Sequence, residues 1–448
     1  MSKYTPVSCR LTLPALAAIS LLMAGTAGAQ MPAPPSPPAA ATPSTQADGV
    51  PMLTLRDLVQ TVVTHNPGLL ASQRSRDSAA AAIRSANARP NPSLEMGTGQ
   101  NRARLPGANA GAIATWGVAQ FIENPRLRQS RIEAAQHAER GQAAQIQLTR
   151  SELVAQVRVK AFEYLLRREE AQAAADALAL LEQIRERVKL RVDTGEAARY
   201  EIIKADAEII NARQKYQTAS LQIEQAALSI NRLAAGALPA RWSLAASLSD
   251  SMELSALAEY RAQARDTHPE LRALQAEVAR REARLDEARA SRWPGVELRY
   301  SQVRDPEVRQ GMLSASVQIP LLDQRSGPQA EAMAELERAR TLLDGRRAEL
   351  DQQVLLAWKA MEVARVRVSA LSTGAVREAE AALRVAEAAY RFGERGILDV
   401  LDAQRLLRTV RADLLDARYQ AQAASVDLDF LAGRYADPAS PTATTFQE

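Results

Sequence analysis

The chain repeats its own pattern after an interval of 198 to 202 residues, and this duplication restricts its possible folds more than any other feature. Asn66-Pro67 aligns with His268-Pro269 at an offset of 202. After a loop that is four residues shorter in the second copy, Gly195 aligns with Gly393 at an offset of 198. Such a period is far longer than that of a solenoid repeat. We therefore expect two equivalent repeats, residues 53–235 and 253–435, joined by an inter-repeat segment at 236–252.

Apolar residues recur with heptad spacing near the end of both repeats. The two sets coincide once the offset of 198 is subtracted. A sustained heptad in both copies favours coiled-coil packing, and its small alanines permit close approach between helices. An ordinary helical bundle is the alternative. The positions are Ile209, Ala212, Tyr216, Ala219, Ile223, Ala226, Ile230 and Leu233, and then Leu407, Val410, Leu414, Ala417, Ala421, Ala424, Leu428 and Leu431.

Helix signals predict the same order of elements in each repeat. A short helix ends at an Asn-Pro or His-Pro break, where the proline suits the first turn of the next helix. Two strands joined by a polar, Gly-rich loop follow, and then a very long helix, a Gly break and a returning helix. His65 and His268 are interpreted as equivalent helix-start residues. The predicted helices cover residues 67–89, 127–193 and 198–234, and then 269–291, 326–391 and 397–432.

The helix at 127–193 is the longest element and would extend for about 100 Å at 1.5 Å per residue. No compact globular domain needs such an element. The two shorter helices of a repeat could stack end to end beside it. The low aromatic content of 4% agrees with long helices packed side by side. Gly195, Gly393 and Gly396 allow the chain to reverse between antiparallel helices, so the fold class is mainly α with a small β part.

Two strand pairs, at about residues 92–122 and 294–320, alternate in polarity. This alternation is typical of membrane strands that present apolar side chains outward. A soluble hairpin with one face on a helical core is the alternative for either pair alone. Trp116, Trp293 and Tyr300 are candidates for an aromatic girdle. In the second pair, Val296, Leu298 and Tyr300 alternate with Glu297, Arg299 and Ser301, and Leu313, Ala315, Val317 and Ile319 alternate with Ser314, Ser316 and Gln318.

Strand count and register leave one prediction and one open question. Four strands cannot close a barrel, which needs about eight or more. Three copies would supply twelve strands, so we expect a homotrimer. In the first pair, Trp116 and Val118 have the opposite parity to Ile113 and Phe121. Both a bulge and a different register account for this pattern.

The two ends of the chain carry segments that do not belong to the repeats. A basic start and an apolar run precede the cleavage site Ala27-Gly28-Ala29, so residues 1–29 are predicted to be a cleaved signal peptide. Cys9 is the single cysteine and precedes the apolar run, which predicts an exported protein that is not lipidated. Residues 30–52 form a Pro-rich linker and residues 436–448 a C-terminal tail.

Composition and motifs argue against several function classes. The formal net charge is only +4, with 56 basic and 52 acidic residues spread along the chain, so no nucleic-acid partner is expected. One cysteine and three histidines make a His/Cys metal site improbable. Because the phosphate-binding, nucleophile and zinc-protease motifs are absent, we expect neither an enzyme nor a cofactor.

Several local motifs resemble the TolC-like outer-membrane efflux family over about residues 53–435. They include Arg89-Pro90-Asn91-Pro92 before the first strand pair and Ile319-Pro320-Leu321-Leu322-Asp323 after the second. The most specific is Gly396-Ile397-Leu398-Asp399-Val400-Leu401-Asp402-Ala403-Gln404 at the second hairpin tip. The resemblance implies a trimeric 12-stranded β-barrel in the outer membrane joined to an α-helical barrel in the periplasm. Its partners would be outer-membrane lipid, a periplasmic adaptor (membrane fusion protein) and an inner-membrane RND-type pump.

The same resemblance assigns a periplasmic gate to the hairpin tips. Asp399 and Asp402, three residues apart on one helix face, would line the constriction in each of three chains. Arg395 matches an arginine that ties neighbouring coiled coils together, and Glu201 is assigned as a gate partner. A solvated helix face is the alternative for these charges. Tip residues that would receive the adaptor are Val192, Thr194, Gly195, Ala197, Phe392, Gly393, Gly396 and Ile397.

Two spots favour the heavy-metal, CzcC- and CusC-like branch of that family. They are Pro90-Asn91-Pro92 and the turn Leu322-Asp323-Gln324-Arg325-Ser326-Gly327. We therefore expect an outer-membrane duct that passively exports metal ions or small toxic compounds handed over by the pump and adaptor. A type I protein-secretion duct and a non-channel coiled-coil envelope spacer are the alternatives.

Overall fold

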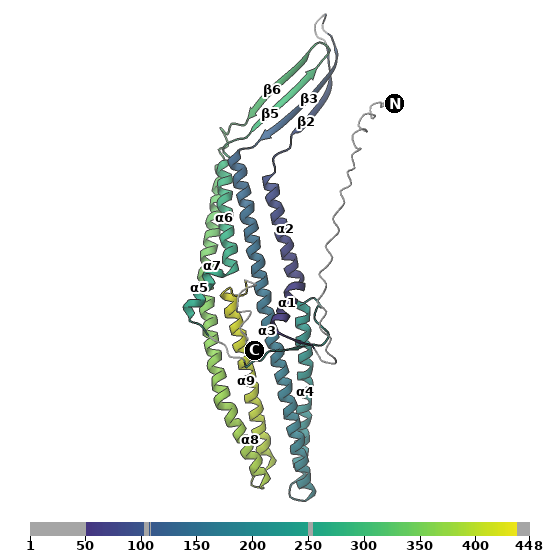
Figure 1. Ribbon diagram of the computed structural model, residues 1–448, viewed down its shortest axis with the longest axis vertical. Helices are drawn as coiled ribbons and strands as arrows, with labels where there is room; N and C mark the ends of the chain where they lie inside the picture. Colours follow the sequence, from purple (N-terminus) through teal and green to yellow (C-terminus); the bar gives the residue numbers. More distant parts are fainter. Residues whose placement is uncertain (1–50, 103–106, 108, 250–253, 437–448) are drawn as a thin grey trace, which may run out of the picture. The chain divides into compact units, whose positions relative to one another are not determined.

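The computed structural model describes residues 51–102, 107, 109–249 and 254–436 (Figure 1). The predicted signal peptide at 1–29, with Cys9, lies outside the described residues, as do all but the last two residues of the linker at 30–52. The C-terminal tail, apart from Ala436, also lies outside them. The assignments for these segments stay predictions.

The predicted order of elements is confirmed in both repeats. The first contains β1 (Met52–Leu53), α1 (Leu55–His65), α2 (Pro67–Asn87), β2 (Ser93–Asn101), β3 (Gly111–Ile122), α3 (Pro125–Asp193) and α4 (Arg199–Leu233). The inter-repeat segment contains β4 (Ser243–Leu244). The second repeat contains α5 (Leu257–Thr267), α6 (Pro269–Ala290), β5 (Val296–Arg304), β6 (Arg309–Val317), α7 (Ser326–Ala370), a π-helical turn (Leu371–Ala375), α8 (Val376–Arg391) and α9 (Ile397–Leu431). The fold is therefore mainly α with one small sheet. The repeat boundaries at 235 and 253 stay a prediction.

The helix α3 organises the helical layer. It has 69 residues, or about 100 Å at 1.5 Å per residue, and packs against α2, α4, α6 and α9 (Figure 1). The predicted end-to-end stacking of shorter helices is present, because the Asn66 side-chain amide at the start of α2 donates to the Leu233 carbonyl at the end of α4 (2.9 Å). In the second repeat the Thr267 hydroxyl, at the end of α5, donates to the Ala432 carbonyl (2.8 Å), each one residue from the matching position.

Three apolar clusters hold the helices together. One joins α1, α3 and α4 to residues 234–248, a second joins the four helices of the two hairpins, and the third joins α5, α6, α7 and α9. Most of the predicted heptad positions are buried, several of them in these clusters, whereas Tyr216 is exposed. The inter-repeat segment contributes Trp242, whose ring stacks on Tyr164 with 4.8 Å between ring centroids.

The two histidines beside the helix breaks are not equivalent, contrary to the sequence interpretation. His65 is the last residue of α1, and its ring bonds the Thr61 carbonyl (2.9 Å). Asn66 caps α2 by accepting a hydrogen bond from the Leu69 amide (3.1 Å). His268 occupies the Asn66 position in the second repeat but makes no capping bond. It is 1% exposed, so it is a buried imidazole.

The predicted helix over 326–391 is interrupted, which is a second correction. Between α7 and α8 lies the π-helical turn Leu371–Ala375. There the Thr373 hydroxyl donates to the Ser369 carbonyl (2.7 Å), and Gly374 adds a poor helix former. The matching stretch of α3, residues 173–177, is Ala-Ala-Ala-Asp-Ala and stays α-helical. The two repeats therefore differ in the regularity of their long helix.

The four long strands form one antiparallel sheet in the order β2-β3-β5-β6 (Figure 1). The pairing is continuous along β3, from Ser93↔Ala119 to Asn101↔Gly111 on one side and from Ala114↔Arg304 to Ile122↔Val296 on the other. The structure thus decides the open question of register without a bulge. The outer edges of β2 and β6 have no strand partner among the described residues. No helix in the same residues is both long and apolar enough to cross a membrane.

Candidate functional sites on the sheet and at the hairpin tips

One face of the sheet is apolar and exposed. Side chains that pair directly across strands share a face, so the row Leu94, Val118, Tyr300 and Leu313 lies together. These four side chains are between 40% and 77% exposed. The parity problem is thereby resolved: Trp116 and Val118 belong to the apolar face, and Ile113 and Phe121 lie on the opposite one. The predicted alternation of β5 and β6 is confirmed.

The opposite face carries an ion-pair network. The Arg299 guanidinium contacts Glu297 on its own strand (3.0 Å) and reaches across β3 to Glu95 on β2. The intervening strand allows this reach because Gly117 and Ala119 are small. The sheet therefore has one apolar and one largely polar surface.

Two of the three predicted girdle residues lie together, and the third lies apart. Trp116 and Tyr300 form an edge-to-face pair with 5.6 Å between ring centroids, and the Trp116 indole donates to Gln302 (2.9 Å). Trp293 lies apart, between α6 and β5, and is 72% exposed. Their membership of one girdle stays a prediction.

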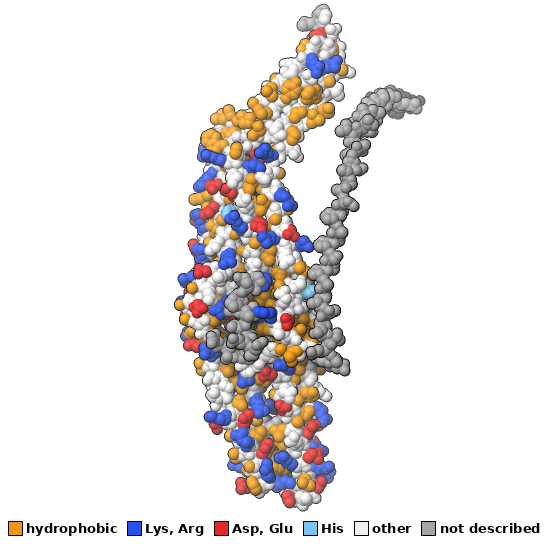
Figure 2. All heavy atoms as spheres, viewed as in Figure 1, with side chains coloured by type: hydrophobic (Ala, Val, Ile, Leu, Met, Phe, Trp, Pro, Cys, Tyr) orange, Lys and Arg blue, Asp and Glu red, His pale blue; other side chains and the backbone are white. Residues whose placement is uncertain are grey.

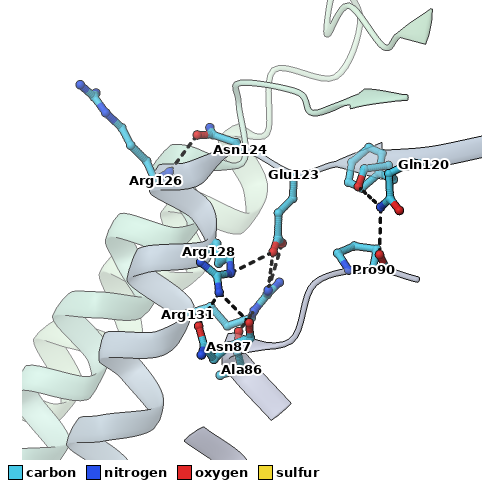
Figure 3. A network of polar contacts seen from close by, with 10 residues as sticks. Ala86, Asn87, Pro90, Gln120, Glu123, Asn124, Arg126, Arg128 and Arg131 are labelled. Carbon is cyan, nitrogen blue, oxygen red and sulfur yellow. Dashed lines mark hydrogen bonds and ion pairs between the residues drawn. The ribbon is translucent and has the colours of Figure 1, made fainter. Parts of the chain in front are cut away.

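The joint between the sheet and the helices is built on the start of α3 (Figure 3). Glu123 accepts from Arg131 (3.0 Å) and pairs with Arg128 (3.6 Å), whose guanidinium also donates to the Asn87 carbonyl (2.7 Å). Asn124 caps α3 and donates to the carbonyls of Ala290 (3.1 Å) and Trp293. The first turn of α3 is thereby fastened to the ends of both α2 and α6.

The hairpin turns end their helices in the same way. Gly195 and Gly393 adopt φ of 81° and 75°, and the amides of Glu196 and Glu394 bond back to the carbonyls of Arg191 (2.8 Å) and Ala389 (2.9 Å). Gly396 differs from the prediction, because its φ is −80° and any residue adopts that conformation. It caps α9 rather than reversing the chain.

The predicted acidic pair lies on the first turns of α9. Asp399 and Asp402 are exposed, with side-chain accessibilities of 47% and 71%. Each aspartate has a basic partner within four residues in the sequence: Arg395 lies 3.8 Å from Asp399, and Arg405 lies 3.2 Å from Asp402. Arg395 makes no link to the other hairpin within the described chain. Its predicted role between neighbouring coiled coils stays a prediction.

Glu201 is placed beside the second hairpin rather than beside the aspartates. The Tyr390 hydroxyl donates to the Glu201 carboxylate (3.3 Å), and Arg191 donates to the Tyr390 carbonyl (3.0 Å) while stacking over its ring at 4.7 Å. Burial, and next the Glu201 carboxylate, raise the pKa of Tyr390, which keeps its hydroxyl a hydrogen-bond donor. These contacts tie the two tips of one chain together.

A second tie between the hairpins was missed by the sequence reasoning. The Arg405 guanidinium bonds Glu208 on α4, whose side chain is 12% exposed, as well as Asp402. The Glu208 hydrogen bond raises the pKa of Arg405 further. Arg405 could have been found as the i+3 partner of Asp402. No sequence signal pairs it with Glu208, because the repeats place alanine and leucine at the symmetry-related positions.

The predicted adaptor contacts divide by exposure. Thr194, Gly195, Phe392, Gly393 and Gly396 are exposed, and Phe392 reaches 77%. Val192 and Ala197 are half-buried. Ile397 is 2% exposed within the hairpin cluster, so in this conformation its side chain serves packing and offers no contact surface.

Within the residues described, no group of three or more His, Cys, Asp or Glu side chains is arranged to hold a metal ion. The ring of the buried His268 lies edge-to-face against Phe430, with 5.8 Å between ring centroids.

Comparison with known proteins gives a consistent result. The sequence pattern of the family described as "Outer membrane efflux protein" matches residues 58–236 and 261–434. The cobalt-zinc-cadmium resistance protein CzcC of Cupriavidus metallidurans is 25% identical over 384 residues, covering 85% of this chain and 90% of CzcC.

Solved structures show the same fold. A structure of CusC superimposes with a TM-score of 0.74 at 18% identity, covering 85% of this chain and 92% of CusC. The open-state MtrE outer membrane channel of Neisseria gonorrhoeae gives 0.71 at 20% identity, covering 85% of this chain and 88% of MtrE.

Proposed function

The chain belongs to the outer membrane efflux protein family and is an outer-membrane duct for tripartite efflux, and we propose that three copies of it close around one channel. The observation that carries this proposal is the sheet, which has an exposed apolar face and two unpartnered edges among the described residues. An edge strand with free backbone groups at membrane depth is unstable unless it is paired. Joining β6 of one copy to β2 of the next satisfies both edges, and three copies give the twelve strands of a small barrel.

Exposed apolar residues on the outer helices support the same assembly. On α4, Ile203, Ile210, Leu221 and Leu228 are 62% to 67% exposed at spacings of seven and eleven residues, which keep them on one face. On α7, Leu342, Leu356 and Val363 are 54% to 70% exposed at multiples of seven. We propose that the α4 face of one copy packs against the end of α7 and against α8 of the next, where Val366 and Val385 are 67% and 68% exposed. This contact would extend the barrel into a helical tunnel.

The first prediction concerns assembly. Native mass spectrometry of the detergent-solubilised protein is expected to give three times the mass of the processed chain. Ile210→Glu with Leu221→Glu should shift the population towards monomer, because two charges enter the proposed interface. Arg74→Glu, on an exposed part of α2, is the matched surface control and should stay trimeric. A monomeric wild-type protein without a lumen contradicts the proposal.

We propose that the hairpin tips form the periplasmic gate. Six carboxylates, Asp399 and Asp402 from each of three chains, would stand near one axis and prefer cations. Glu201, through Tyr390, and Arg395 would fix the tips around them. The exposed tip residues, Phe392 foremost, would receive a periplasmic adaptor, which couples the duct to an inner-membrane RND-type pump. Export through it is passive, and the pump supplies the energy.

The second prediction concerns the cargo. We propose divalent metal ions, a class supported by the similarity to the cobalt-zinc-cadmium resistance protein. Deleting the gene from its host is expected to lower the tolerated concentrations of cobalt, zinc and cadmium salts severalfold, with dye tolerance unchanged, and the wild-type chain should restore them. Lost dye tolerance alone would assign small toxic organic compounds instead. Lost secretion of a protein would favour the type I secretion duct, and no change in any export would favour an envelope spacer.

A further inference from the structure

The joint between sheet and helices contains a hollow that the duct function leaves unused. Ile122, Pro125, Arg126, Trp293 and Val296 line a cavity of about 510 Å³. A second cavity of about 400 Å³ adjoins it, shares Arg126 and Trp293, and adds Arg289, Asp286 and Ser130. Both volumes lie within the range of ligand sites. They open where the apolar sheet face ends and the helices begin.

The hollow combines one free cation with a fixed frame. Arg126 is exposed, its side chain has no hydrogen bond or ion pair among the described residues, and it points away from the Glu123 network in Figure 3. The positive end of the α3 dipole also disfavours an arginine there, so local stability does not explain it. Asn124 holds the frame by bonding the carbonyls of Ala290 and Trp293.

Among the charged side chains that line the two cavities, Arg126 is the one without an ion-pair partner among the described residues. Glu123 is occupied by Arg128 and Arg131, and Asp286 is occupied by Arg289 (3.2 Å). Arg126 therefore matches one monoanionic group. A phosphodiester carries this charge and offers oxygens to a guanidinium in bidentate geometry.

The apolar side of the hollow indicates what the phosphate is attached to. Ile122 and Val296 pair across β3 and β5 and begin the exposed apolar face. Trp293, at 72% exposure, has the amphipathic ring that gathers at the headgroup level of membranes. In the loop after β6, Leu321 and Leu322 are 76% and 101% exposed at the same end of the sheet. Figure 2 shows hydrophobic side chains over the sheet giving way to Lys and Arg where the helices begin.

We propose that this hollow binds the phosphate group of a membrane phospholipid, with Arg126 on the phosphate, Trp293 beside the headgroup, and the acyl chains along Ile122 and Val296. Arg289 lies at the rim and keeps its pairing with Asp286. The proposal rests on the outer-membrane function and adds a specific lipid site to it. One site per chain would fix the depth of the sheet in the inner leaflet.

The test is native mass spectrometry of the full-chain protein in detergent with three probes: phosphatidylglycerol, diacylglycerol with the same acyl chains, and glycerol phosphate. Up to three phosphatidylglycerol molecules are expected per trimer, with little retention of the other probes. Arg126→Gln should lower phosphatidylglycerol retention about tenfold, and Arg126→Lys should keep most of it. Arg74→Gln is the control. It removes an exposed arginine that pairs with Asp77 outside the hollow, and it should leave phosphatidylglycerol retention unchanged.

Each other outcome rejects the lipid site. Equal retention of diacylglycerol means apolar contact without phosphate recognition, and equal binding of glycerol phosphate means a phosphate site without lipid. Unchanged phosphatidylglycerol retention in Arg126→Gln would show that Arg126 does not bind the phosphate. If Arg126→Gln fails to fold, Trp293→Leu provides a second variant, which should also lower phosphatidylglycerol retention. The same spectra report the oligomer mass, so failure of the site is distinguishable from failure of the proposed trimer.

Discussion

Arg405→Ala is expected to raise the conductance of the protein in planar bilayers about tenfold. The substitution removes the bond to Glu208 and leaves that carboxylate, with 12% side-chain exposure, unpaired near Asp402. A charge-assisted hydrogen bond contributes about 1.5–3 kcal/mol, and partial exposure of Arg405 brings this towards about 1.4 kcal/mol. That amount changes the ratio of open to closed states about tenfold.

Two controls separate the tie from the charge. Arg377→Ala removes a more exposed arginine, whose neighbour is Glu378 at 3.6 Å, and should leave conductance unchanged. Arg405→Lys keeps the charge and should recover part of the closed state. If Arg405→Ala conducts like the wild type, the α4–α9 tie does not hold the gate.

The aspartates should govern selectivity more than opening. Asp399→Asn removes a carboxylate whose own partner, Arg395, is distant at 3.8 Å, so it should weaken cation preference with little rise in conductance. Asp399→Ala together with Asp402→Ala also removes the Asp402 partner of Arg405, so this double variant should both weaken cation preference and raise conductance. Unchanged selectivity in the double variant would move the constriction away from α9.

Acidification from pH 7 to pH 5 is expected to cost each chain about 2 kcal/mol of folding free energy through His268. Burial, which outweighs the opposing effect of Glu270, lowers the pKa of His268 to about 4 from 6.5. The unfolded chain therefore binds a proton at pH values where the folded chain does not. Stability from this group is complete above pH 6.5 and is lost as the pH falls towards 4.

His268→Asn should narrow the difference between the thermal midpoints at pH 7 and pH 5, as followed by circular dichroism. Asparagine is the residue at this place in the first repeat, where Asn66 bonds Leu69 and Leu233. Burial raises the pKa of Asp429, which acts in the opposite direction, so the comparison of variants isolates His268. His65→Asn, at an exposed histidine, is the control. If the difference between the two thermal midpoints is the same in His268→Asn as in the wild type, the acid sensitivity comes from groups other than His268.

The sequence was most informative where local pattern and packing agree. Pro67 and Pro269 begin their helices, and the alternation in β5 and β6 predicts which side chains share a face. Both features depend on neighbours within a few residues. The resemblance to the efflux family also proved correct, because its motifs lie at the breaks between elements.

The remaining features depend on contacts that a duplicated pattern does not encode. Tyr390 meets Arg191 and Glu201 across the repeats, yet its symmetry mate is Val192, so the offset of 198 gives no hint of the contact. Ile397 fits an exposed tip in sequence but is drawn into the cluster between hairpins. The prediction that His65 and His268 are equivalent was wrong because it compared residue types. The alignment of the repeats instead pairs His268 with Asn66.

The π-helical turn at Leu371–Ala375 has a consequence for the proposed trimer. The duplicated sequence suggests a ring of six equivalent hairpins. In the proposed trimer, however, hairpins with an unbroken long α-helix would alternate with hairpins whose long helix contains a wider π-helical turn. The two kinds will bend with unequal ease. We therefore expect the proposed trimer to dilate with threefold symmetry, because the long helix of the second repeat bends at its π-helical turn and the long helix of the first repeat does not.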